Sequence, residues 1–146
     1  MIKSELLAPA GNAAKLSTAF HFGADAAYVG GKQFSLRSFA DNFSLEELAN
    51  AVKFAHSLNK KLYLTANIFA KNADFSALED YFKALQEIGV DAVIISDPGV
   101  VYFAKKVAPK LNIHLSTQAN TTNKYAVKFW QELGVSRVIL ARELSL

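Results

Sequence analysis

The residues of this sequence that could do chemistry form an amide-rich set, and they follow apolar runs typical of buried strands. In chain order these candidates are Asn67, Asp97, Gln118, Asn120, Arg142 and Glu143. Amides bind planar heterocycles and carbonyls through paired donors and acceptors, whereas hydrolysis needs a nucleophile, a base or a metal. We therefore expect substrate binding at these positions, and the sequence identifies no catalytic residue.

Several candidates also have a structural explanation. Asp97 precedes Pro98 and suits the N-cap of a helix, while Asn67 and Gln118 suit a buried hydrogen-bond network. Arg142 and Glu143 suit ion pairs across strand ends. The residue types alone leave both interpretations open at each position.

The three histidines favour no metal site. His114 lies in the middle of an apolar run and is expected to be a core histidine. His21 and His56 lie in helical patterns without a second ligand four residues on. Glu5 and the turn "APAGN" are further candidates beside the first predicted strand.

An aromatic loop, "GGKQFSLRSFADNF" over residues 30–43, lacks any helical or alternating period. Phe34, Phe39 and Phe43 could cap a pocket, and Arg37 would then offer a cation to a carboxylate or a phosphate. Aromatic rings beside an arginine also suit an unstacked RNA base. We include Gly30 and Arg37 among the candidate site positions.

Helical and strand patterns alternate along the chain. Strands are predicted at 5–8, 26–30, 61–67, 92–97, 113–118 and 137–142, and helices at 12–22, 44–58, 75–88, 99–108 and 123–133. Gly23, Gly89 and Gly134 suit the left-handed position that follows a helix, and Asn59 takes the equivalent place. Such alternation predicts a parallel sheet covered by helices.

A β/α barrel fits better than an open doubly wound sheet. The turn after the first strand has no G-x-G-x-x-G fingerprint. Alternate residues of "KLYLTAN" and "IHLSTQ" place Tyr63, Thr65 and Asn67, and likewise His114, Ser116 and Gln118, on one face that would line a barrel.

A closed TIM-type barrel has eight strands, so the roughly six strands and five helices predicted here are too few to close one. We expect an α/β fold in which residues 1–146 form a single domain, the N-terminal portion of an incomplete TIM-type barrel. Either the chain is a truncated fragment, or a second copy or the missing C-terminal half completes the sheet.

Composition narrows the class of protein. Of 146 residues 51% are hydrophobic and 20% charged, with a formal charge of +3, which permits an anionic partner such as RNA without requiring one. There are no cysteines, so disulfides and thiolate chemistry within this chain are excluded. The sequence shows no secretory signal and no apolar run long enough to span a membrane, so we expect a cytoplasmic location.

The strings "ELLAPAGN", "AFHFGADAAYVGGKQFSLRSFADNF", "IISDPG", "HLSTQANTTN" and "VKFWQELGVSRVILARELSL" together resemble the N-terminal part of the collagenase-like peptidase family, group thirty-two of the peptidases of unknown catalytic type. The resemblance runs almost end to end and implies a barrel-type fold. It implies longer members with downstream cysteines that hold an iron-sulfur cluster, a cofactor that this chain cannot ligate through cysteine.

The branch that this sequence resembles, through "SLR" and "ARELSL", acts in prephenate-linked 5-hydroxylation of the tRNA wobble uridine, and a sister branch modifies ribosomal RNA. The expected function is therefore RNA modification, with tRNA and a small carboxylate such as prephenate as partners. Two alternatives stay open: a collagenase-type peptidase, as the family name suggests, and a non-catalytic binding fragment.

Overall fold

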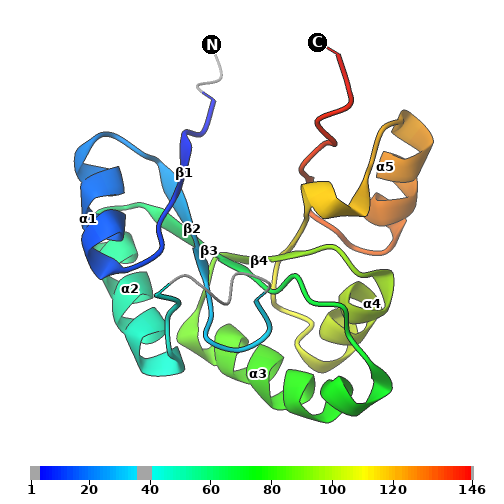
Figure 1. Ribbon diagram of the computed structural model, residues 1–146, viewed down its shortest axis with the longest axis horizontal. Coiled ribbons are helices and arrows are strands. Elements are labelled where there is room, and N and C mark those ends of the chain that lie inside the picture. The colour runs from blue at the N-terminus through cyan, green and yellow to red at the C-terminus, as the bar shows by residue number, and fades with distance from the viewer. Residues whose placement is uncertain (1–3, 36–40, 146) are drawn as a thin grey trace.

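The computed structural model describes residues 4–35 and 41–145. In these residues six parallel strands alternate with five α-helices and two short 3-10 turns (Figure 1). The elements are β1 (Leu7–Pro9), α1 (Ala13–His21), β2 (Ala26–Gly30), α2 (Leu45–Ser57), β3 (Lys61–Thr65), η1 (Asn72–Asp74), α3 (Phe75–Ile88), β4 (Ala92–Ile95), α4 (Pro98–Val107), β5 (Ile113–Leu115), η2 (Thr117–Ala119), α5 (Lys124–Glu132) and β6 (Arg137–Val138).

The strands lie in the sheet in chain order, each parallel to the next, and β1 and β6 form the two edges. Figure 1 shows the five helices in an arc along the outer side of this sheet. The fold is a half-barrel, and the predicted β/α architecture is confirmed. None of the helices in the described part of the chain is long and apolar enough to cross a bilayer.

The main hydrophobic core lies between the sheet and the helices. Leu62 and Leu64 of β3 point into it and are fully buried, as are Phe82 of α3 and Ile95 of β4. The intervening residue Tyr63 points to the opposite, inner face, in a smaller cluster that also includes Ala26, Ala92 and Ile94. The alternation read from "KLYLTAN" therefore assigns the two faces of β3 correctly.

The helix ends agree with the predicted signals to within about one residue. Asn12, Ser44 and Asn123 each cap a helix through the side-chain oxygen, and Ser44 forms a capping box with Glu47. Gly23, Gly89 and Gly134 have φ values of 96°, 80° and 82°, which confirms their left-handed positions. Asp74, which directly precedes α3, does not cap it through its side chain and instead accepts a hydrogen bond from the Lys71 backbone N–H.

Every strand except β2 is shorter than predicted, and β3 and β4 each end two residues early, at Thr65 and Ile95. β5 ends at Leu115 and not at residue 118, because the Ser116 side chain caps the 3-10 turn η2 and Asn120 takes a left-handed φ of 51°. β6 spans only Arg137–Val138, and β1 begins at Leu7, so Glu5 precedes it. At β5 the local hydrogen bond of the Ser116 side chain, which periodicity does not register, ends the strand.

The ends of the aromatic loop lie side by side, because Gly31 and Phe43 form an isolated β-bridge. Phe43 is 5% exposed and joins the helix-side core, and the partly buried Phe34 packs there against Tyr81 with ring centroids 5.1 Å apart. The expectation that Phe34 and Phe43 cap the inner pocket is therefore wrong. Their burial against the helices secures the loop to α3.

Candidate functional site

A cavity of about 250 Å³ lies on the inner face of the sheet, toward the carboxyl ends of the strands. Ligands of parallel α/β folds bind at this end because the strand-to-helix loops converge there. Its lining combines hydroxyl and amide groups with an apolar base: Leu7, Tyr28, Ser35, Thr65, Asn67, Ile94, Ser116, Thr117, Gln118 and Ile139.

Ser116 connects the segments that follow β3 and β5 in this cavity. Its hydroxyl oxygen accepts a hydrogen bond from Asn67 Nδ2 at 3.1 Å and another from the Gln118 backbone N–H at 3.3 Å. The early end of β5 places Ser116 there, and the Asn67 amide reaches it from the end of β3. The Ser116 hydroxyl thus fixes the orientation of the Asn67 side chain.

Asn67 Oδ1 is buried and has no hydrogen-bond partner among the described residues. A buried acceptor without a donor costs about 1–3 kcal/mol. A donor from a ligand, or from a part of the protein outside the described residues, would recover that energy. Thr65 is already satisfied, because its hydroxyl donates to the Val29 carbonyl at 3.1 Å.

The candidate residues fall into three groups. Asn67 and Gln118 line the same cavity. Asp97 caps α4, since its Oδ1 accepts from the Val100 N–H at 2.9 Å, as the structural explanation of the sequence predicted. Gly30 ends β2, and a Cβ there would collide with the Asn42 side chain, so its lack of a side chain is required by packing.

The other candidates lie on the rim. Asn120, Arg142 and Glu143 follow the carboxyl ends of β5 and β6 and are exposed. The Ala141 N–H donates to the Thr121 carbonyl, which secures the segment before Arg142. Arg37 lies outside the described residues, so its predicted role stays a prediction.

A charged cluster occupies the opposite end of the inner face. Arg137 of β6 pairs with Glu5, with Nη1 and Oε1 2.6 Å apart, and the Tyr63 hydroxyl donates to Glu5 Oε1 and Oε2 at 3.0 and 2.9 Å. The His114 ring packs edge-on against Tyr63 at 4.6 Å. Glu5, expected near the carboxyl end of β1, therefore lies at its amino end. Arg137 is not among the candidates predicted from the sequence, although alternation with Ile139 places it on the inner face.

Burial and charge shift the pKa values of this cluster. Partial burial would raise the pKa of the Glu5 carboxyl, but hydrogen bonds from Arg137 and Tyr63 outweigh it and hold that pKa below its usual range. Burial, with a smaller effect of Arg137, lowers the pKa of His114 to about 4. Burial and the hydrogen bond to Glu5 raise the pKa of Tyr63 to about 12. His114 and Tyr63 are thus both uncharged at neutral pH.

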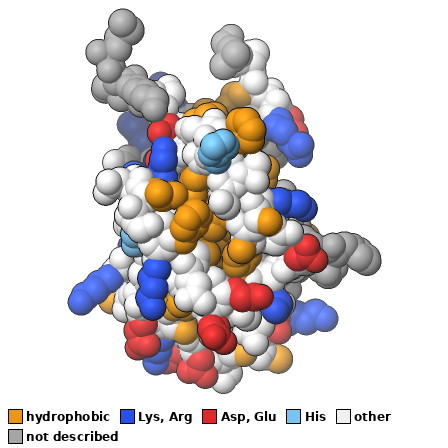
Figure 2. Space-filling model, turned by 90° about the vertical axis from the view of Figure 1, so that its left-hand side faces the viewer, with side chains coloured by type: hydrophobic (Ala, Val, Ile, Leu, Met, Phe, Trp, Pro, Cys, Tyr) orange, Lys and Arg blue, Asp and Glu red, His pale blue; other side chains and the backbone are white. Residues whose placement is uncertain are grey.

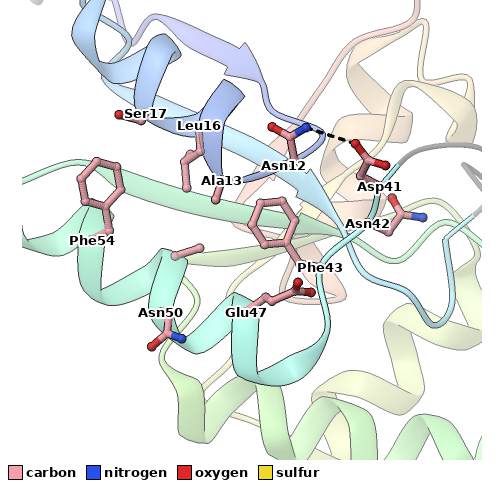
Figure 3. Close-up of a pocket in the computed structure, with 11 residues that line it drawn as sticks. Asn12, Ala13, Leu16, Ser17, Asp41, Asn42, Phe43, Glu47, Asn50 and Phe54 are labelled. Atoms are coloured by element: carbon pink, nitrogen blue, oxygen red, sulfur yellow. Dashed lines mark hydrogen bonds between the residues drawn. The ribbon is translucent and has the colours of Figure 1, made fainter.

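A larger cavity, of about 450 Å³, lies outside the half-barrel between α1 and α2. Figure 2, which views this side of the molecule, shows hydrophobic side chains in a band down the middle of the face. Figure 3 shows Leu16, Phe43 and Phe54 facing the cavity, and at one end Asn12 Nδ2 donates to Asp41 Oδ2 at 3.1 Å. Sequence periodicity did not reveal this groove, because both helices show an ordinary amphipathic pattern.

The inner cavity offers hydrogen-bond partners. The described residues contain no group of three or more histidine, cysteine or acidic side chains that could hold a metal ion. The chain has no cysteine, so its own residues do not fit the iron-sulfur cluster that the resemblance implies. The arrangement can bind and orient a planar polar ligand between the ends of β3 and β5.

Comparison with known proteins gives a consistent result. The family model of peptidase family U32 matches residues 11–146. The chain is 51% identical over 143 residues to tRNA hydroxylation protein P1 of Bacillus subtilis, and 48% identical over 147 residues to tRNA hydroxylation protein P of Helicobacter pylori. These matches cover 98% and 100% of this chain but only 34% and 35% of the relatives, so the chain spans about a third of their length.

A more distant relative is the 23S rRNA 5-hydroxycytidine C2501 synthase of Escherichia coli, which is 36% identical over 97% of this chain and 21% of its own length. Among solved structures, that of the U32 peptidase Mk0906 matches with a TM-score of 0.76 at 14% identity, over 94% of this chain and 58% of the other. At that identity the structural match shows the shared fold alone.

Proposed function

The chain belongs to peptidase family U32, and from that premise we propose that it acts in the hydroxylation of a tRNA nucleoside. The observation that carries the proposal is the 51% identity to tRNA hydroxylation protein P1 along 98% of this chain. A relative that hydroxylates cytidine in ribosomal RNA supports RNA as the substrate class.

The inner cavity supports a binding role for this part of the protein. A pyrimidine base presents donors and acceptors on its edge, and Asn67 and Gln118 can pair with such groups. Hydroxylation adds an oxygen atom, and the described cavity residues supply no redox group for that step. We therefore assign substrate binding and orientation to this chain, as the N-terminal portion of a β/α barrel.

Partners follow from the same proposal. The exposed Arg142 guanidinium on the rim can pair with a small carboxylate such as prephenate. β1 and β6 each leave an edge of the sheet that another part of the protein, or a second copy, can cover. We also propose a cytoplasmic location, which a tRNA substrate would support.

The surface of α5 also suits RNA. Tyr125 and Phe129 are 69% and 53% exposed, and the ammonium groups of Lys124 and Lys128 lie 5.2 and 6.0 Å from the Tyr125 ring centroid. Among the described residues neither lysine forms an ion pair. An exposed ring beside two unpaired cations matches a nucleic-acid surface in charge and in stacking.

The test is nucleoside analysis of tRNA by mass spectrometry in cells that lack the gene and carry either the wild-type protein or a variant. We expect hydroxylated nucleosides to disappear without the gene, and Asn67→Ala and Gln118→Ala to reduce them at least several-fold. Asn50→Ala, an exposed amide on α2 outside the half-barrel, is the control and should restore them fully. Unchanged nucleosides in cells without the gene would end the proposal.

Peptidase activity is the second candidate, favoured by the family description and by the fold shared with a U32 peptidase. The contacts of Ser116 argue against its use as a nucleophile. Its hydroxyl contacts the Asn67 amide and a backbone N–H, and neither of these groups is a base. Cleavage of gelatin by the purified protein, lost on Ser116→Ala, would favour the peptidase. Binding of tRNA without any effect on modification would favour the non-catalytic role.

A further inference from the structure

Phe69 is the most exposed of the large hydrophobic side chains that the structure describes, with 86% of its surface accessible. It lies in the loop between β3 and η1, on the carboxyl side of the sheet. Asn67, which lines the inner cavity, is two residues away, so their Cα atoms lie within about 7.6 Å of one another. Phe69 therefore lies in the loop that directly follows the cavity residue Asn67.

The exposure of Phe69 follows from its neighbours. Ile68 and Ala70 are partly buried and pack against the helix-side core, so the loop is held on both sides and Phe69 is directed outward. Most other phenylalanines of the described chain have aromatic partners: Phe75 packs edge-on against Phe103 at 5.0 Å, for example, and Phe43, which has no such partner, is buried in the core. No such ring contact is found for Phe69 among the described residues.

A cation lies next to this ring along the chain. Lys71 is exposed, and its backbone N–H donates to Asp74 Oδ2 at 2.7 Å, which fixes the end of the loop at η1. Among the described residues its ammonium group has no ion-pair partner. An exposed ring followed at two residues by a free ammonium group matches a base and its neighbouring phosphate.

We propose that Phe69, in the loop that follows the cavity residue Asn67, stacks on an unpaired base of the RNA substrate, and that Lys71 contacts an adjoining phosphate. This inference rests on the proposed function, and it names the residue that positions the RNA. It gives to Phe69 the stacking role that Phe34 and Phe43 cannot take, because those two rings are directed into the core, whereas Phe39 and Arg37 lie outside the described residues. The side chain acts by stacking and takes no part in bond making.

The test uses the intact protein and an unmodified transcript of the tRNA whose modification depends on the gene. Phe69→Ala should weaken binding, measured by fluorescence anisotropy, about 10-fold, within the range of roughly 5- to 150-fold found for loss of one stacked base. The slope of affinity against salt should not change, since stacking releases no counterions. Lys71→Ala should instead reduce that slope by about 1, and Phe69→Tyr should restore binding.

Phe22 supplies a matched control. It is 79% exposed but caps the carboxyl end of α1, at the opposite end of the strands, so Phe22→Ala should leave tRNA affinity unchanged. If wild-type protein and Phe69→Ala bind the transcript equally, the stacking role is wrong while the proposed function stands. Equal affinity with a clearly lowered melting temperature of Phe69→Ala would show that protein covers the ring. If wild-type protein binds no tRNA and the gene does not affect modification, both proposals fail.

Discussion

Glu5 and Arg137 form an ion pair with Oε1 and Nη1 2.6 Å apart, although 132 residues separate them along the chain. Glu5 precedes the first strand of the sheet and Arg137 begins the last, so the pair joins the two edges of the half-barrel across its inner face. The Tyr63 hydroxyl, from the middle of the sheet, donates to the same carboxylate. The pair thus holds the curvature of the sheet at its amino-terminal end.

We expect a double-mutant cycle of Glu5→Ala and Arg137→Ala to give a coupling free energy of about 1 kcal/mol in urea unfolding of the intact protein. Solvent screens the pair in part, because the two side chains are 22% and 40% exposed. The pair of Lys83 and Glu79 on α3 is the control, with the same 2.6 Å distance on a more exposed surface and an expected coupling of about 0.3–0.5 kcal/mol. Equal coupling free energies would mean that the Glu5–Arg137 pair stabilises the fold no more than an exposed surface pair does.

His114 should make the protein less stable in mild acid. Its pKa is about 4 in the folded protein, because burial and then the Arg137 charge oppose protonation, against an ordinary value of 6.5. Between these values the unfolded chain binds more protons, so the free energy of unfolding falls as pH drops from 6.5 to 4, by up to about 3 kcal/mol. Glu5, whose pKa is lowered, adds to this loss only below about pH 4.5.

His114→Phe keeps an aromatic ring against Tyr63 and removes the titrating group. We expect its free energy of unfolding to change much less than that of the wild type between pH 6.5 and 4.5, measured by urea unfolding at several pH values. His21→Phe, on the exposed side of α1, should retain the wild-type dependence. A wild-type dependence that survives in His114→Phe would assign the effect to another group.

A side chain at Gly31 should destabilise the protein as long as the Tyr81 hydroxyl is present. A Cβ at Gly31 would collide with the Tyr81 hydroxyl, which packs from α3 against the start of the aromatic loop. We expect Gly31→Ala to destabilise the protein by about 1–3 kcal/mol, and Tyr81→Phe to recover much of that loss in the double variant because it removes the colliding oxygen. Thermal unfolding of the four proteins tests this. Purely additive effects of the two substitutions would contradict the contact.

Asp97 should act as a helix cap and not as a catalytic acid. Asn caps helices as well as Asp does, so Asp97→Asn should retain both stability and tRNA modification, whereas Asp97→Ala should lose about 1 kcal/mol of stability. Urea unfolding and nucleoside analysis of both variants separate the capping role of Asp97 from a catalytic role. A stable Asp97→Asn variant without modification would show that the carboxylate itself is needed.

The sequence by itself determined the succession of elements and the way each strand faces. Glycines at the left-handed positions and side-chain caps such as Ser44 are local devices, since they act between residues a few positions apart, and the helix ends were predictable to about one residue for that reason. Alternation along β3 assigned Tyr63 to the inner face because the period of two is a property of the strand itself.

Only the tertiary structure decided which of the candidate residues meet. That Asn67 and Gln118 share a cavity, and that Ser116 orients Asn67, depends on contacts between β3 and β5 that no local pattern encodes. The pairing of Glu5 with Arg137 and the collapse of Phe34 and Phe43 toward the helices have the same origin. Strand order, shear and loop packing determine which side chains meet across a sheet. Periodicity along one strand indicates only the face of the sheet on which a side chain lies.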